Sequence, residues 1–187
     1  MPVSATSLDL SGVKLLKPTK YSDNRGSFSE VYSRRDLISA GITVDFVQDN
    51  HSVSVDTGTV RGMHFQIPPF AQHKLVRVVR GSILDVLIDI RPESPTYGSH
   101  ISVTISAEEG NQVYVPVGIA HGFMTLEPNT EVIYKVSDYY SPDHERGILW
   151  NDEDLRISWP QQSKIVISEK DKLWPKLRDL VPISSWQ

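Results

Sequence analysis

Residues 115–123 read VPVGIAHGF, a stretch in which a proline, two glycines and a histidine interrupt an apolar run. Short segments rich in β-branched and aromatic residues lie around it, and such segments are typical of strands. The strands that we predict cover residues 60–66, 74–79, 83–90, 100–105, 112–115 and 131–136. Turn-forming stretches such as RPESPTYG and EPNT separate them. Short strands at this spacing favour a β-sandwich or small barrel over an alternating β/α fold.

Helical signals are confined to two places. Residues 34–40, followed by Gly41, predict one short helix with a C-terminal glycine. SEKDKLWPKLRDL, which starts at Ser168, has a candidate N-cap and a modest apolar stripe. We therefore expect a single domain over residues 1–187, with an all-β jelly-roll core from about 20 to 160 and a C-terminal helical segment at about 168–182.

Composition restricts the classes of function. The 187 residues are 39% hydrophobic and 22% charged, which is a globular composition. A net charge of −4 with scattered basic residues argues against a nucleic-acid surface, and the lack of cysteine excludes disulfides, thiolate zinc sites and a cysteine nucleophile. No secretory signal is seen, and no apolar run approaches the roughly 20 residues that a membrane span needs. We expect a soluble, cytoplasmic protein without a membrane partner.

Polar side chains interrupt two of the predicted strands. In VRGMHFQ, residues 60–66, regular alternation places His64 on one face and Arg61 on the other. In ILDVLIDI, residues 83–90, Asp85 and Asp89 alternate with aliphatic residues. These carboxylates mark either the solvent face of a half-buried sheet or a polar interior around a ligand. His64 alone is compatible with a metal ligand, a catalytic base or a hydrogen-bonded core residue.

The pattern Pro116-x-Gly118-x-x-His121 resembles the second motif of the cupin superfamily, in which the proline and glycine shape a turn that aims the histidine into the barrel. The resemblance implies a cupin-like jelly roll, or double-stranded β-helix. Metal-binding cupins pair this histidine with an earlier His-x-His, whereas residues 64–66 read HFQ. Iron- or zinc-type metals prefer imidazole or carboxylate to an amide. We therefore predict no metal, and a metal-dependent cupin enzyme remains an alternative.

A longer series of motifs runs from about residue 20 to 175. It comprises SDNRGSFSEVY, FVQDNHS, RGMHFQ, AQHKLVRVVRGSILDVLIDIR, SPTYG, VPVGIAHGF, VIYKVSDYYSP and ILWNDEDLRISWP. With these motifs the chain resembles the dTDP-4-dehydrorhamnose 3,5-epimerase family. The resemblance implies an isomerase that inverts C3 and C5 of dTDP-4-dehydro-6-deoxy-D-glucose, with no cofactor. It also implies a homodimer, because an N-terminal strand crosses to the partner in family members.

The resemblance implies four catalytic residues. His64 matches the base that removes a proton next to the C4 ketone, and Asp171 matches the aspartate that holds the far ring nitrogen. Tyr134 matches the acid on the opposite face of the sugar, and Lys74 matches the lysine that stabilises the enolate. From the residues alone, Ser168-x-x-Asp171 is better explained as a capping box that opens the last helix. An isolated strand tyrosine is likewise more often a packing residue, as Tyr139 and Tyr140 are expected to be.

Substrate-binding positions also follow from the resemblance. They are Arg25, Glu30, Gln48, Asn50, Arg61, His121, Glu145 and Lys170. Arg61, expected opposite His64, suits a diphosphate at the pocket edge or in a neighbouring subunit's pocket. A C3-only or C5-only epimerase of an unusual-sugar pathway and a non-catalytic sugar-nucleotide-binding jelly roll remain alternatives. The residues assign neither the nucleotide preference nor a role for His73.

Overall fold

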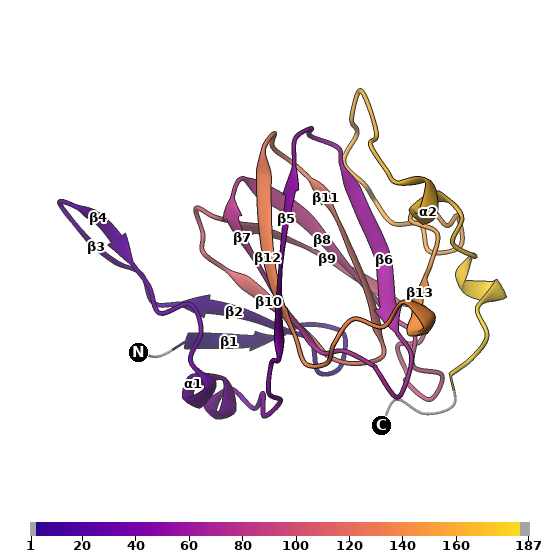
Figure 1. Ribbon diagram of the computed structural model, residues 1–187, viewed down its shortest axis with the longest axis horizontal. Coiled ribbons are helices and arrows are strands. Elements are labelled where there is room, and N and C mark those ends of the chain that lie inside the picture. Colours follow the sequence, from indigo (N-terminus) through magenta and orange to yellow (C-terminus); the bar gives the residue numbers. More distant parts are fainter. Residues whose placement is uncertain (1–2, 184–187) are drawn as a thin grey trace.

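Two antiparallel sheets face each other in the computed structural model, which describes residues 3–183 (Figure 1). The six-stranded sheet has, in spatial order, β1 (Val3–Ser7), β2 (Lys14–Pro18), β10 (Gln112–Val115), β7 (Lys74–Arg80), β12 (Thr130–Val136) and β5 (Gln48–Ser54). The five-stranded sheet has β13 (Glu145–Gly147), β6 (Val60–Gln66), β11 (Ile119–Thr125), β8 (Ser82–Asp89) and β9 (His100–Ser106). The fold is the predicted all-β, cupin-like jelly roll.

All six predicted strands are present, and those at 60–66 and 112–115 have the predicted bounds. The strands that the sequence did not predict are polar, short or adjacent to a turn. β1 leaves four of its five residues exposed at the sheet edge, so it needs no apolar pattern. β11 starts directly after Gly118, whose φ of +79° suits a glycine in the turn of VPVGIAHGF. That stretch is therefore the end of β10, a three-residue turn and the first part of β11.

Strand β8 is buried on both faces, which decides between the two interpretations of its carboxylates. Leu87 points into the core between the sheets, whereas Val86 and Ile88 pack in a second cluster with residues of the C-terminal segment. Asp85 and Asp89 lie on the same side of the strand as Leu87, and both are fully buried. The solvent-face interpretation is therefore wrong. Asp89 accepts hydrogen bonds from the turn that follows it, and Asp85 faces the pocket-lining histidine His121.

Helices decorate the sandwich. α1 (Arg34–Ser39) is capped by Ser33 and packs Leu37 against the six-stranded sheet. α2 (Glu169–Lys172) is capped by Ser168 and is followed by a 3-10 turn, Leu177–Asp179. The expected helical segment at 168–182 is thus two separate turns, because Pro175 cannot continue a helix and restricts the residue before it. Figure 1 shows this C-terminal segment covering β6.

A hairpin of β3 (Tyr21–Asp23) and β4 (Gly26–Phe28) projects from the sandwich (Figure 1). A further 3-10 turn, Pro142–His144, precedes β13. The six-stranded sheet begins with β1, ahead of the expected start of the core near residue 20. Among residues 3–183, no helix is long and apolar enough to cross a membrane. The two ends of the expected 1–187 domain lie outside the described residues.

Candidate active site

Both sheets line a pocket of about 480 Å³. β6 and β11 contribute His64 and His121, and β7 and β12 contribute Lys74 and Tyr134 from the opposite sheet. A polar pocket of about 330 Å³ adjoins it and shares His64, Lys74 and Tyr134. Most of the predicted site residues line one or both pockets, namely His64, Lys74, Tyr134, Asp171, Gln48, Asn50, Arg61, His121, Glu145 and Lys170.

The imidazole of His64 is paired with the carboxylate of Asp171, with Nε2 and Oδ1 2.6 Å apart. Burial acts to raise the pKa of Asp171, but the hydrogen bond and charge of His64, with donors from Gly62 and Trp174, bring that pKa below its ordinary value. The carboxylate is therefore ionised at neutral pH and can only accept, which places the imidazole proton on Nε2. Nδ1 keeps its lone pair and can act as a base.

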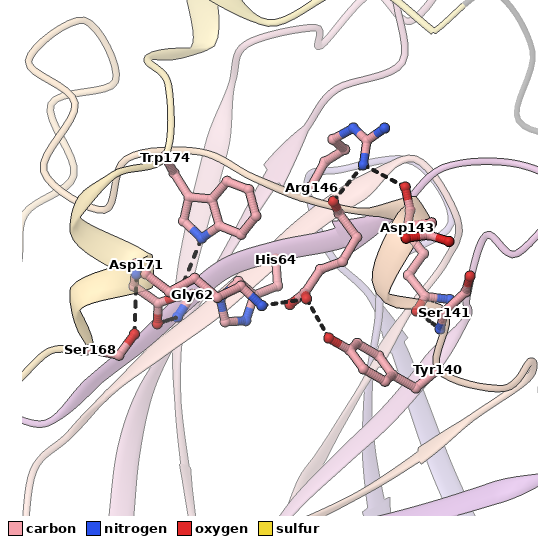
Figure 2. A network of polar contacts seen from close by, with 12 residues as sticks. Gly62, His64, Tyr140, Ser141, Asp143, Arg146, Ser168, Asp171 and Trp174 are labelled. Carbon is pink, nitrogen blue, oxygen red and sulfur yellow. Dashed lines mark hydrogen bonds and ion pairs between the residues drawn. The ribbon is translucent and has the colours of Figure 1, made fainter.

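The two interpretations of Asp171 are compatible. Ser168 Oγ accepts a hydrogen bond from the backbone N–H of Asp171 and caps α2. The carboxylate turns away from the cap, and its Oδ2 accepts from the N–H of Gly62 (Figure 2). Half of a capping box thus aims the side chain of Asp171 at β6.

Lys74 is buried at the start of β7, where its Nζ donates to the carbonyl of His64 at 3.2 Å. Burial lowers the pKa of Lys74 to about 8, against the opposing charges of Asp85 and Glu145. The ammonium of Lys74 therefore loses its proton at a pH that is only slightly above neutral. At neutral pH it remains a cation in a setting of low dielectric, where it can stabilise an oxyanion strongly.

Tyr134 faces the same space from the opposite sheet, and its phenol is a proton donor at neutral pH. Burial, helped by Glu145 and opposed by Arg61, raises the pKa of Tyr134 above its ordinary value. A candidate base on β6 and a candidate acid on β12 therefore lie on different walls of one pocket. This arrangement can remove a proton from one side of a ligand and return one from another.

A second imidazole–carboxylate contact lies deeper. His121 Nε2 and Asp85 Oδ1 are 2.6 Å apart and both side chains are buried, but their alignment does not meet hydrogen-bond geometry. Ser52 Oγ, also on the pocket wall, is another buried polar atom without a hydrogen-bond partner. Buried polar groups of this kind favour a ligand that carries hydroxyls or other hydrogen-bonding groups.

Arg61 lines the pocket together with His64, so the prediction that it faces the other way is wrong. On β11, His121 pairs with His64 and Phe123 pairs with Arg61, so two steps on β11 match three steps on β6. This bulge adds one residue to β6 and brings both side chains to one face. Gly62, with a φ of +122°, lies within it. Arg61 is held by Ser54 Oγ and the carbonyl of Val53, at 3.2 and 3.1 Å.

Glu145 connects α2 to the pocket mouth. It accepts hydrogen bonds from Lys170 and, at 2.6 Å, from the hydroxyl of Tyr140, the residue that Figure 2 labels. Burial acts to raise the pKa of Glu145, but these two partners lower it overall. Tyr140 is thus an exposed member of the second pocket rather than the packing residue that we expected.

Gln66, where a metal-binding cupin has its second histidine, is committed to loop hydrogen bonds. Its amide donates to the carbonyls of Phe70 and Tyr139 and accepts from the N–H of Ser141. Within residues 3–183, no three histidine, aspartate or glutamate side chains gather closely enough to hold a metal ion.

Two predicted binding residues lie away from this pocket. Arg25 is at the turn of the projecting hairpin, 85% exposed and paired with Asp23 at 2.6 Å. Glu30 lines a separate crevice beside α1. Within one chain, the structure does not bring either residue to His64.

Two further residues acquire a place in the structure. His73, beside Lys74, shares a hydrogen bond of 2.7 Å between its Nδ1 and the hydroxyl of Tyr114. The two rings also stack, so the partner of His73 lies outside the pocket. Trp174 donates to Asp171, and the sequence analysis missed it. Its spacing of three residues from Asp171, one helical turn, was the available signal.

This fold and pocket define a cupin-like chain with a candidate acid–base site between its two sheets. A family model described as dTDP-4-dehydrorhamnose 3,5-epimerase matches residues 7–179. A protein of that name from Sinorhizobium fredii is 49% identical over 178 residues, which cover 95% of this chain and 91% of the relative.

Solved structures that resemble this chain belong to the same family. A Bacillus anthracis enzyme of the same name, with TDP and PPi bound, is 45% identical with a TM-score of 0.91 and covers 93% of this chain and 99% of its own. A Legionella pneumophila epimerase in complex with dTDP-4-keto-L-rhamnose is 36% identical with a TM-score of 0.93 and covers 99% of both chains. The chain belongs to the dTDP-4-dehydrorhamnose 3,5-epimerase family and is an isomerase.

Proposed function

We propose that the protein inverts C3 and C5 of dTDP-4-dehydro-6-deoxy-D-glucose and forms dTDP-4-dehydro-L-rhamnose. The observation that carries the proposal is the imidazole–carboxylate pair on one wall of a pocket whose opposite wall holds a protonated phenol and a buried ammonium. The two solved relatives are described with TDP and with a dTDP-keto sugar, which supports a substrate of this class.

In the proposed cycle, Nδ1 of His64 takes the proton next to the C4 ketone, and Asp171 stabilises the imidazolium that forms. The electron pair moves onto the carbonyl oxygen, where the ammonium of Lys74 stabilises the enolate. Tyr134 then returns a proton to the opposite face of the same carbon, which inverts it. Solvent restores the protonation of both residues, and the cycle repeats at the second carbon.

Substrate binding in this proposal uses Arg61 for the diphosphate, because a guanidinium pairs well with phosphate oxygens. The polar side chains Gln48, Asn50, His121, Glu145 and Lys170 supply further contacts around the two pockets. Arg25 and Glu30 reach a substrate only in a second subunit's pocket, so the proposal includes a homodimer. The dimer and a cytoplasmic location both stay predictions.

The test is to incubate the purified protein with the 4-keto sugar nucleotide in deuterated water and follow C3 and C5 by NMR. We expect deuterium at both carbons together with the signals of the inverted sugar. Exchange at one carbon alone indicates a C3-only or C5-only epimerase. Absence of exchange at both carbons contradicts the proposal, and activity that a chelator abolishes favours the metal-dependent alternative.

A further inference from the structure

Trp174 lies just after α2, three residues after Asp171, and its indole is half buried. The indole contacts the His64–Asp171 pair, but among the described residues Trp174 is not one of those that line the two pockets. Its Nε1 donates to Asp171 Oδ1 at 3.2 Å, the oxygen that also binds His64 Nε2 at 2.6 Å (Figure 2). The rings of Trp174 and His64 meet edge to face, with their centroids 6.1 Å apart. One side chain thus touches both members of the pair.

The indole of Trp174 packs against β13 at Gly147. Gly147 is the cross-strand neighbour of His64, and a Cβ on Gly147 would lie 2.5–2.6 Å from three atoms of the indole ring. Only a residue without a side chain leaves room for the ring there. On the far side, the N–H of Leu149 binds the carbonyl of Pro175 at 2.8 Å and fixes the chain directly after Trp174.

We propose that Trp174 is a positioning residue for the acid–base chemistry, and that its indole N–H holds the Asp171 carboxylate in the orientation that aims His64 at the sugar. The carboxylate has three donors, namely His64 and Trp174 on Oδ1 and the N–H of Gly62 on Oδ2. Two of these donors are neutral and come from different elements, so they fix the carboxylate plane before any substrate binds. This inference rests on the proposed function, because it assigns a task within the same proton transfer.

The indole N–H also has an electrostatic consequence. It shares the charge of Oδ1 with His64, so less of that charge stabilises the imidazolium. Without the indole donor, His64 faces a carboxylate with one partner fewer, and its proton is held more tightly. A rate that depends on neutral His64 then needs a higher pH to reach its plateau.

The experiment compares Trp174→Phe with the wild-type protein by pH–rate profiles of kcat and kcat/KM for the 4-keto sugar nucleotide. Phenylalanine keeps an aromatic ring against Gly147 and removes the donor. We expect kcat to fall about tenfold or more, the value of one hydrogen bond to a charged group, with KM within about twofold. We also expect the acid limb of kcat/KM to move to higher pH.

Trp159→Phe is the matched control. The indole of Trp159 is also half buried, and its Nε1 donates to the backbone carbonyl of Trp150 at 2.8 Å. This hydrogen bond lies outside both pockets. Its loss is expected to lower thermal stability and leave the acid limb in place. Gly147→Ala is the second test variant, since its methyl group would lie 2.5–2.6 Å from atoms of the indole and displace the ring, and it should reproduce the shift of the acid limb.

The outcomes separate the inference from the proposed function. If wild-type protein exchanges no deuterium, the proposed function fails, and the positioning role that rests on it is overturned as well. If wild type is active but both Trp174→Phe and Gly147→Ala keep its acid limb and kcat, the positioning role is overturned. A lower unfolding temperature in Trp174→Phe with an unchanged acid limb likewise overturns it, because that result describes packing alone.

Discussion

His64 and Asp171 are 107 residues apart in the chain and 2.6 Å apart in the structure, joined from Nε2 to Oδ1. β6 supplies the imidazole and the one-turn helix α2 supplies the carboxylate. The pair therefore forms only when the C-terminal segment docks on the five-stranded sheet. That segment covers apolar side chains of β6 and β8 and, in the same contact, completes the proposed base.

Asp171→Asn keeps the size of the side chain and removes its charge. An amide can donate to Nε2 and so favour the tautomer whose lone pair no longer lies on Nδ1. We expect kcat to fall about 10²- to 10⁴-fold in steady-state assays.

Asp152→Asn is the control for that loss. Asp152 is also buried, but it accepts from the N–H groups of Leu177 and Asp154 outside the pocket. Its replacement should lower the unfolding temperature and keep kcat within about twofold. Equal losses of kcat in the two variants would assign Asp171 a purely structural role.

The pKa of Lys74 predicts how the rate changes on the alkaline side of the pH–rate profile. Its pKa of about 8 means that the ammonium is lost as the pH rises through that value, so kcat should fall above about pH 8. Lys74→Arg keeps the charge at higher pH, because a guanidinium does not titrate in this range. We expect this variant to be slower but to lose its alkaline limb. A limb at the same pH in Lys74→Arg would belong to another group.

Tyr134→Phe should separate proton removal from inversion. His64 can still abstract the proton in this variant, whereas the opposite wall no longer offers an acid. We expect deuterium to enter the substrate with its configuration retained, and the inverted product to fall about 10²-fold or more. Tyr114→Phe is the matched control, because this buried phenol bonds His73 outside the pocket. Normal product formation by Tyr134→Phe would refute its role as the acid.

The position of Arg25, away from His64 of its own chain, predicts that each active site of the dimer uses Arg25 of one subunit and His64 of the other. Coexpression of Arg25→Ala and His64→Asn chains with different tags would give mixed dimers in which one of the two pockets has both native residues. We expect each variant alone to be weak and the purified mixed dimer to regain activity. A mixed dimer of His64→Asn and Asp171→Asn should stay inactive, since both residues belong to one chain's pocket. If Arg25→Ala alone matches wild type, Arg25 has no role in binding.

Much of the fold could be predicted because segments rich in β-branched residues, such as residues 83–90, are typical of strands, although the burial of Asp85 and Asp89 could not be assigned. The polar edge strands β1 and β5 could not be predicted, since β1 is largely exposed, β5 alternates exposed with half-buried side chains, and neither has an apolar face. The place of Arg61 could not be predicted either, because one extra residue in β6 reverses the alternation of faces and only the pairing with β11 shows it.

The candidate site depended on resemblance for its most important pair. From its own spacing, Asp171 predicts only a helix cap, and the structure confirms the bond to Ser168. That its carboxylate also reaches β6 is a tertiary contact, which local sequence does not contain. The same holds for Trp174, whose seat depends on Gly147, a residue that precedes it by 27 positions and looks like any turn glycine.

The most direct measurement is solvent exchange by His64→Asn. Asparagine removes the titrating ring and leaves a small polar group on β6. With the 4-keto sugar nucleotide in deuterated water, we expect wild-type protein to incorporate deuterium at C3 and C5. The variant should exchange both positions about 10²- to 10⁴-fold more slowly, although it still binds the nucleotide sugar. Exchange by His64→Asn at the wild-type rate would contradict the assignment of His64 as the base.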